Sequence, residues 1–402
     1  MRGINLFLFS NIDNTKGERQ LRRISVDGGT NILLHLINNI DEGEVHIVTQ
    51  KGNKVRFLQT INNRNVTFWE FSPFIQSIFP NWFFLEILFR SFFLPVSLLI
   101  KYPHVDYLVS SSDFWPDSIP AFIYKMFHPK TKWVAGFFLM APAPWSKNNP
   151  YKRKNFVIGL MYWLTQLPIY FLIKSFANYV LVTSEPDKKK FVTNVRNINN
   201  VVVAKGGVDV LPSTAFFEKI HAHPEVKKKY DACFLGRFHF QKGVIELIEI
   251  WRRVVKSSPK AKLAMIGDGP LKTEVEKLIK RYRLQRNVIL FGYLDGKKKY
   301  NIFKESRIII HPAIYDSGGM SAAEGMAWKL PGVSFDLEAL KTYYPKGMLK
   351  VPCYDIDEFA ITVKNLLSNK DLYKKLSSEA RQLILKEWSW PTRCHKILEQ
   401  IK

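Results

Sequence analysis

Short apolar runs alternate with longer segments of helical spacing along the whole chain, and this alternation restricts the fold more than any other feature. INLFLFS, VHIVTQ and VDYLVSSS in the first half, and DACFLG, AKLAMIG and RIIIHP in the second, are typical of buried parallel strands. Segments such as TNILLHLINNI and LKTEVEKLIKRYR lie between them. Strands that alternate with helices predict an α/β protein with parallel sheets.

The length of the chain bounds the number of domains. At 402 residues it exceeds what one ordinary core supports, and it holds enough strand–helix units for two doubly wound domains. We place the junction near GGVDVLPS, at residues 206–213. The sequence therefore predicts an N-terminal Rossmann-like domain at 1–208, a C-terminal one at 209–380 and a helical tail at 381–402.

Cysteine usage and the first residues bear on the cellular compartment. Cys233, Cys353 and Cys394 are scattered and odd in number, and no pair has metal-ligand spacing, so a reducing compartment is expected. The opening MRGINLFLFS has an apolar run of only about six residues, shorter than the ~7–15 of a secretory signal. It is predicted to be the first buried strand.

The formal net charge of +24 favours an anionic partner, which could be a phosphate ligand, nucleic acid or an acidic membrane. A solvated basic surface explains most of this charge equally well. The triple lysines at 188–190, 227–229 and 297–299 are predicted to be solvated in this way.

One segment departs from the rest in composition. Between Ser118 and Ser184 there is no Asp or Glu, while there are eight Lys or Arg and 15 aromatic residues. It contains the apolar run Phe156–Ile173, and an earlier apolar run spans Phe79–Ile100. Both approach the ~20 residues that span a bilayer. Prolines interrupt both runs, and Glu86 and Arg90 lie in the earlier one, so we expect interfacial or core helices.

Two glycine-containing loops follow strands in the second half. GRFHFQKG, residues 236–243, offers Arg237 and Lys242 directly before a helix, and a helix start with two cations suits an anion, especially a diphosphate. IGDGP, with Gly267, permits a tight turn and close approach of a ligand. Each loop could also be an ordinary turn whose basic residues are solvated.

The stretch YDSGGMSAAEGMAWKLPG places seven residues between two carboxylates, Asp316 and Glu324. It follows a predicted strand, and we expect a helix to begin near Ser321 with Glu324 in its first turn. Carboxylates that flank such a loop are suited to sugar and ribose hydroxyls, although they could be plain turn and helix acids. The loop amides available for anionic oxygens belong to Gly318, Gly319 and Met320.

In this order and at domain-scale spacing, GRxxxQKG, GDGP, the loop ending at Gly292 and D-x7-E followed by GMAWKLPG resemble a known family. They are similar to the C-terminal domain of the retaining glycosyltransferases of GT-B fold, family 4 (glycosyl transferases group 1). The resemblance is strong over residues 231–336. It implies two Rossmann-like domains that face a central cleft, and a C-terminal tail that packs back toward the N-terminal domain.

The resemblance also implies roles for matching residues. Arg237 and Lys242 would bind the donor diphosphate and stabilise the leaving group. Asp316 would stand where the family's first Glu contacts the transferred sugar, and Glu324 would hold the ribose. Further donor contacts would come from Gly28, Gly29, Gly267, Gly318, Gly319 and Met320. The family implies neither a metal nor a cofactor.

The sequence departs from the family at two places. Asp316 is one methylene shorter than the usual Glu, and GFFLMAPAPW has no histidine where many members place one near the reacting centre. A retaining transfer in which the departing phosphate takes the acceptor proton tolerates this loss, whereas an inverting one needs a base. Asp113 and Asp117 could supply a carboxylate or be turn and cap acids, and His239 is expected to be a surface residue.

We therefore predict a retaining, metal-independent hexosyltransferase that moves a sugar from a nucleotide-diphosphate donor to a glycan or lipid-linked acceptor. The basic, aromatic segment predicts peripheral contact with an anionic membrane, at the cytoplasmic face. The alternatives are a GT-B sugar-nucleotide hydrolase or epimerase, a catalytically inactive nucleotide-sugar-binding module, and a nucleic-acid-binding protein. No nucleic-acid-binding motif is present, so nucleic acid is not an expected partner.

Overall fold

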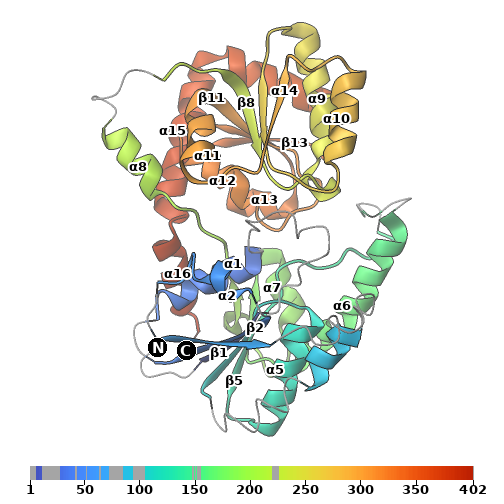
Figure 1. Cartoon of the computed structure of the whole chain (residues 1–402), viewed down its shortest axis with the longest axis vertical. Coiled ribbons are helices and arrows are strands. Elements are labelled where there is room, and N and C mark those ends of the chain that lie inside the picture. Colours follow the sequence, from blue (N-terminus) through green and yellow to red (C-terminus); the bar gives the residue numbers. More distant parts are fainter. Residues whose placement is uncertain are drawn as a thin grey trace. The chain divides into compact units, whose positions relative to one another are not determined.

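The computed structural model describes residues 6–10, 28–40, 43–50, 52–62, 65–71, 85–93, 105–146, 149, 151, 155–219 and 226–401. The chain divides into two compact units (Figure 1), of which the first comprises residues 1–206 and 393–402 and the second residues 207–392. Both units are parallel α/β structures, as the alternation of strands and helices predicts.

The first unit is built on a seven-stranded sheet with the order β3-β2-β1-β4-β5-β6-β7. Its strands are β1 (Leu6–Ser10), β2 (Val45–Gln50), β3 (Val66–Phe71), β4 (Tyr107–Ser110), β5 (Lys132–Gly136), β6 (Tyr179–Val182) and β7 (Val201–Val203). Its helices include α1 (Gly28–Ile37), α2 (Lys54–Phe57), α5 (Trp115–Phe127), α6 (Phe156–Phe176) and α7 (Glu185–Phe191). The opening apolar run forms β1, as predicted.

The second unit is built on a six-stranded sheet with the order β10-β9-β8-β11-β12-β13. Its strands are β8 (Tyr230–Leu235), β9 (Leu263–Ile266), β10 (Val288–Gly292), β11 (Ser306–His311), β12 (Gly332–Phe335) and β13 (Met348–Val351). Its helices are α8 (Leu211–Glu218), α9 (Val244–Ser257), α10 (Lys272–Arg281), α11 (Gly296–Glu305), α12 (Met320–Met326), α13 (Glu338–Tyr343), α14 (Ile356–Ser368) and α15 (Lys370–Glu387). The strand order reverses between β8 and β11, which makes their carboxyl ends the expected place for a ligand.

Alternation along each strand divides the second core between the two faces of the sheet. Ala232 and Phe234 of β8 pack in one cluster with α9, α10 and α14, whereas Cys233 packs in the other with α11, α12 and α15. Figure 1 shows these two sets of helices on opposite sides of the sheet. On α9, buried residues recur at helical spacing, as at Val244, Leu247, Ile248 and Trp251. Because both faces are covered, the middle residues of these strands are mostly apolar.

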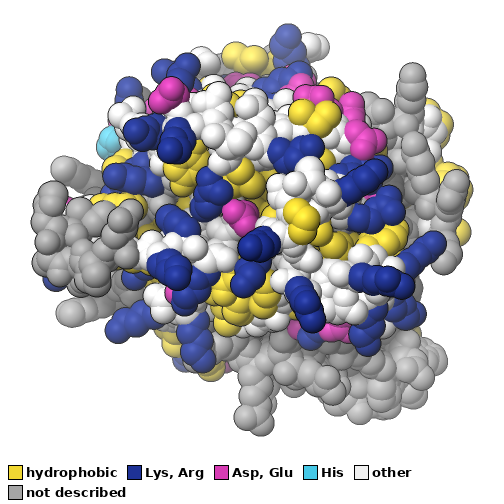
Figure 2. Space-filling view, turned by 90° about the horizontal axis from the view of Figure 1, so that it is seen from above, with side chains coloured by type: hydrophobic (Ala, Val, Ile, Leu, Met, Phe, Trp, Pro, Cys, Tyr) yellow, Lys and Arg dark blue, Asp and Glu magenta, His cyan; other side chains and the backbone are white. Residues whose placement is uncertain are grey.

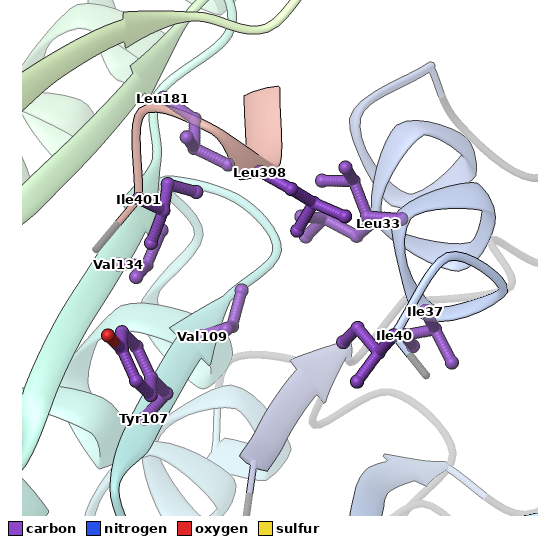
Figure 3. Close-up of a pocket in the computed structure, with 10 residues that line it drawn as sticks. Leu33, Ile37, Ile40, Tyr107, Val109, Val134, Leu181, Leu398 and Ile401 are labelled. Carbon is purple, nitrogen blue, oxygen red and sulfur yellow. The ribbon is translucent and has the colours of Figure 1, made fainter. Parts of the chain in front are cut away.

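The C-terminal residues complete the core of the first unit. Helix α16 (Trp390–Leu398) follows α15, and Leu398 and Ile401 line an apolar pocket with Leu33 and Ile37 of α1 and with strand residues (Figure 3). The predicted tail starts at 381, which lies inside α15, because helical spacing alone does not show where one unit ends and the next begins. The structure assigns only residues 393–402 to the first unit.

Basic side chains are spread over the surface. The face in Figure 2 shows many more Lys and Arg side chains than Asp and Glu, and they are distributed between polar and apolar residues rather than gathered in one stripe. This distribution agrees with a largely solvated excess of charge on that face.

Candidate functional site

Two loops meet where the strand order of the second sheet reverses. They follow β8 and β11 and span residues 236–243 and 312–319. The backbone N–H groups of Ile314 and Tyr315 donate to the carbonyl of Gln241, at 2.9 and 3.2 Å. Gly243 has a φ of 64°, and a Cβ there would lie 1.8 Å from the carbonyl oxygen of Pro312. Glycine is therefore required for the two loops to touch.

The loop after β8 gathers positive charge. Lys242 ends a short 3-10 turn, and α9 begins at Val244. Burial, and then the charges of Arg237 and Lys242, lower the pKa of His239 to about 4. His239 is thus half-buried beside two cations rather than a surface residue. Arg237 is exposed, and the predicted binding of an anion by Arg237 and Lys242 stays a prediction.

The carboxylate of Asp316 faces back into its own loop. Its Oδ1 accepts hydrogen bonds from the backbone N–H groups of Ser317, Gly318 and Gly319, at 2.8, 3.3 and 3.3 Å. Its Oδ2 accepts from Lys242 Nζ at 2.6 Å and His311 Nε2 at 3.0 Å. Burial alone would raise the pKa of Asp316, but Lys242 and His311 hold it well below its usual value. Two predicted loop amides and a predicted cation are therefore already paired with Asp316.

His311 is not among the residues that the sequence predicts for the site. This residue ends β11, is buried, and donates to Asp316 in the loop that follows this strand. The signal that could have found it is its position, because a polar residue that closes an apolar strand run at the carboxyl edge of a parallel sheet lies next to the ligand loops.

Gly267 and Gly269 let the loop after β9 pack against the loop after β8. Their φ angles are 142° and 155°, and added Cβ atoms would lie 1.9 Å from the carbonyl oxygen of Gly236 and 2.7 Å from that of Phe238. Gly267 therefore has a packing role in this structure. Its predicted contact with a ligand stays a prediction.

Helix α12 begins at Met320, one residue earlier than expected, with Gly319 as its N-cap in the left-handed conformation. Glu324 consequently lies in the second turn, and its predicted position in the first turn is wrong. Glu324 Oε2 pairs with Lys299 Nζ of α11 at 2.6 Å, and Lys299 also lies 3.1 Å from Asp295. Burial raises the pKa of Glu324, and the charge of Lys299 opposes that shift.

Lys299 corrects the prediction that the triple lysines are all solvated. Only 13% of its side chain is exposed, and Lys228, in another triple, donates to the carbonyls of Lys304 and Ser306 at 2.8 Å. The missed signal is helical spacing, because Lys299 precedes the buried residues Ile302 and Phe303 by three and four positions. Such a lysine lies on the inner face of its helix.

In the first unit, Gly28 and Gly29 open α1, and residues 11–27 before them lie outside the described part. Asp117, in the first turn of α5, accepts hydrogen bonds from the hydroxyls of Ser111 and Ser112, which precede the helix. Asp113 accepts from the side chain of Gln166 at 2.7 Å.

Residues 216–383 match the family model described as glycosyl transferases group 1. The second unit is a group 1 glycosyltransferase domain. The loops after β8, β9 and β11 and helix α12 all lie inside the matched segment of this domain. The family resemblance that the ordered motifs predict is thereby confirmed.

A curated relative of the glycosyltransferase domain is the poly(ribitol-phosphate) alpha-N-acetylglucosaminyltransferase of Staphylococcus aureus. It is 26% identical over 220 residues, which is 50% of this chain and 43% of that protein. The chain spans about half the length of the curated relatives it matches.

Solved structures resemble the whole chain, including the unit that precedes the glycosyltransferase domain. Anabaena HepE, solved with UDP and glucose, has a TM-score of 0.70 at 12% identity and covers 99% of both chains. A point mutant of S. aureus TarM, solved with fondaparinux, alpha-GlcNAc-glycerol and UDP, has a TM-score of 0.70 at 14% identity over 99% of this chain and all of that one. The predicted two-domain GT-B fold is confirmed.

Proposed function

We propose that the protein is a retaining, metal-independent hexosyltransferase that moves a sugar from a nucleotide-diphosphate donor to a glycan or lipid-linked acceptor, without a cofactor. The observation that carries this proposal is the convergence of Arg237, Lys242 and the start of α9 at the carboxyl end of β8, beside the loop after β11. Cations and N–H groups that are fixed in advance stabilise the negative charge that develops on a departing diphosphate. The UDP in the HepE and TarM structures supports a donor of this type.

The loop after β5 supports the retaining course. Residues 136–145 contain no histidine, and Asp113 and Asp117 are engaged in hydrogen bonds within the first unit. With no base positioned there, the acceptor proton passes to the departing phosphate. The acceptor then attacks the sugar on the same face from which the phosphate departs. An inverting transfer would need a base on the opposite face.

A donor screen tests this proposal. Thermal shift with several nucleoside diphosphates and their sugars should identify one stabilising pair, and that donor should glycosylate an acceptor with the anomeric configuration retained, as seen by NMR. Release of free sugar without transfer to any acceptor would favour the hydrolase, and an isomerised donor would favour the epimerase. Binding without turnover would indicate an inactive binding module, and an inverted product would refute the retaining course.

The second part of the proposal is peripheral binding of the first unit to an anionic membrane through α6. Among the described residues this helix is long and apolar enough to cross a bilayer, and only 22% of its most apolar window is buried. Its buried residues include Gly159, Gln166 and Ile173, while Val157 and Phe171 are exposed. At 100° per residue these two sets lie on opposite faces. The outward face is thus apolar, the reverse of an ordinary surface helix.

Hydrogen bonds tie the inner face of α6 to its unit. Gln166 Nε2 donates to Asp113 Oδ2 and to the carbonyl of Leu139, and Gln166 Oε1 accepts from the N–H of Ala141, at 2.7, 2.8 and 2.6 Å. A helix that left this position to span a bilayer would lose these bonds in a medium that offers no replacement. We therefore place α6 in the plane of the membrane interface rather than across it.

The charge near α6 suits acidic headgroups. Residues 118–184 contain no carboxylate side chain, Lys174 lies near the helix end, and Tyr170 donates to the carbonyl of Lys190 in the basic helix α7. Each Lys or Arg near an anionic surface contributes about 1 kcal/mol. The basic run just before α6 falls on Lys147, Lys152, Arg153 and Lys154, which lie outside the described residues.

Sedimentation with vesicles tests the membrane contact. The protein should bind phosphatidylcholine vesicles that contain phosphatidylglycerol, and Val157→Ser with Phe171→Ser should abolish binding. Ile361→Ser with Leu385→Ser, at exposed apolar positions of the second unit, is the matched control and should bind normally. Serine at the four basic residues before α6 should also weaken binding. Equal binding to neutral and acidic vesicles would refute the role of anionic headgroups, and binding to neither would leave a soluble enzyme with a soluble acceptor.

A further inference from the structure

The hydrogen bonds of Asp316 conflict with a direct contact between this carboxylate and a sugar. A carboxylate has about four acceptor positions. Asp316 already accepts five hydrogen bonds, three from its own loop and two from Lys242 and His311, and its side chain is 7% exposed. No acceptor position is left for a sugar hydroxyl, and little of the group can be reached.

The short side chain of Asp316 explains this arrangement. An aspartate can fold back over the N–H groups of the next three residues, as Oδ1 does here. A glutamate would carry the carboxylate one methylene further from the backbone, away from the N–H groups that Oδ1 accepts from here. In this conformation the loop therefore suits the shorter residue.

His311 fixes the second oxygen of Asp316. A carboxylate offers only acceptors, so the proton of the imidazole lies on Nε2, where it donates to Oδ2. The other ring nitrogen, Nδ1, is buried, and no hydrogen-bond partner for it is found in the described part of the chain. The ring thus has one polar contact, and that contact holds Asp316.

Lys242 shares Oδ2 with His311. The ammonium group of a lysine has three N–H donors, and one is used here. With 29% of its side chain exposed, Lys242 can direct the others to a ligand. Asp316 thereby restricts a flexible side chain to one position before any ligand arrives, which lowers the entropy lost on binding.

We propose that Asp316 and His311 are positioning residues, which hold Lys242 and the loop after β11 in place for the donor diphosphate, and that Asp316 does not contact the transferred sugar. This inference rests on the proposed donor site. It replaces the role that the family resemblance implies for Asp316, and it assigns a role to His311.

Binding of UDP and UDP-glucose, measured by calorimetry, separates the two roles of Asp316. Asp316→Asn should weaken both ligands by the same factor, about ten- to hundredfold, since the lost interaction holds the phosphate contacts. Asp316→Glu should weaken both as well. Asp231→Asn is the matched control, because Asp231 also forms an ion pair, with Arg307, but lies at the opposite end of β8. A loss confined to UDP-glucose, or normal binding by Asp316→Glu, would overturn the proposal.

His311 is tested by His311→Phe, which keeps an aromatic ring without a donor, and by His311→Gln, which restores an N–H. Because His311 helps to lower the pKa of Asp316, removing it should raise that pKa. When UDP affinity is measured against pH, the loss of affinity at low pH should therefore begin at a higher pH in the Phe variant. In the Gln variant it should return toward the wild-type pH. If UDP affinity falls at the same pH in a folded Phe variant as in the wild type, the role of His311 is overturned. If the wild type binds no nucleoside diphosphate in the donor screen, the proposed function itself has failed.

Discussion

Lys299 is the only cation that forms an ion pair with Glu324 among the described residues, and replacing Lys299 with Met removes it. The side chain of Met has a similar length, so the chief change is electrostatic. A buried ion pair broken on one side costs ~3–5 kcal/mol, whereas an exposed pair contributes ~0–1 kcal/mol. The exposed fractions are 13% for Lys299, 31% for Glu324 and 53% for Asp295. These intermediate values predict a loss of about 1–3 kcal/mol at neutral pH.

The loss should depend on pH in a defined direction. Burial raises the pKa of Glu324 and Lys299 opposes this, so Lys299→Met should raise that pKa further. A carboxyl group whose pKa is higher in the folded state binds its proton more tightly there, and the free energy of unfolding falls as pH rises through that pKa. The variant should therefore lose more stability at pH 8 than at pH 5.

Urea denaturation of the full chain at both pH values is the measurement. Lys298→Met is the matched control, because Lys298 is the exposed neighbour in the same lysine run. Adding Glu324→Gln to Lys299→Met should recover part of the loss, since no buried charge then remains unpaired. An equal loss at pH 5 and pH 8, or an equal loss in Lys298→Met, would show that this reasoning is wrong.

Three further predictions concern the loops and the surface charge. Arg237→Ala and Lys242→Ala should each weaken binding of the donor nucleotide by ~1.5–3 kcal/mol in calorimetry, because each removes a charge-assisted contact. Gly243→Ala should be far more destabilising in thermal denaturation than Gly292→Ala, which should cost about 1 kcal/mol. The φ angles are 64° and 66°, but a Cβ at 243 would collide with the Pro312 carbonyl while the space at 292 is open. Duplex DNA should bind weakly and with a steep salt dependence, and a tight complex at physiological salt would favour the nucleic-acid-binding alternative.

The sequence predicts the fold well because the signals for strands and helices are local. Apolar and polar residues alternate within a few positions, and the ordered motifs at 236–243 and 315–332 each follow a strand. Details that depend on distant segments were not predictable in this way. Asp316 pairs with Lys242 of another loop, and Glu324 pairs with a lysine of α11.

Boundaries were the other source of error, since a shift of one residue in the start of α12 moves Glu324 to another turn. Similarly, helical spacing continues across residue 381 in α15, so it does not show that the second unit extends to residue 392. Capping by Gly319 depends on its left-handed backbone, which neighbouring residues impose through packing and which the sequence does not state.

The hydrogen bonds of Gln166 link the position of α6 to the position of the loop after β5. A helix of 21 residues is about 32 Å long, and the amide of Gln166 fixes its middle to the backbone at Leu139 and Ala141, just after β5. If α6 rests on a bilayer, the loop after β5 is held at a constant height above the lipid headgroups. Acceptors would then be sorted by geometry as well as by chemistry, since only a hydroxyl presented at that height can reach the sugar. Lengthening or shortening the spacer between a lipid anchor and the acceptor hydroxyl should accordingly change the rate of transfer more than the affinity for the acceptor.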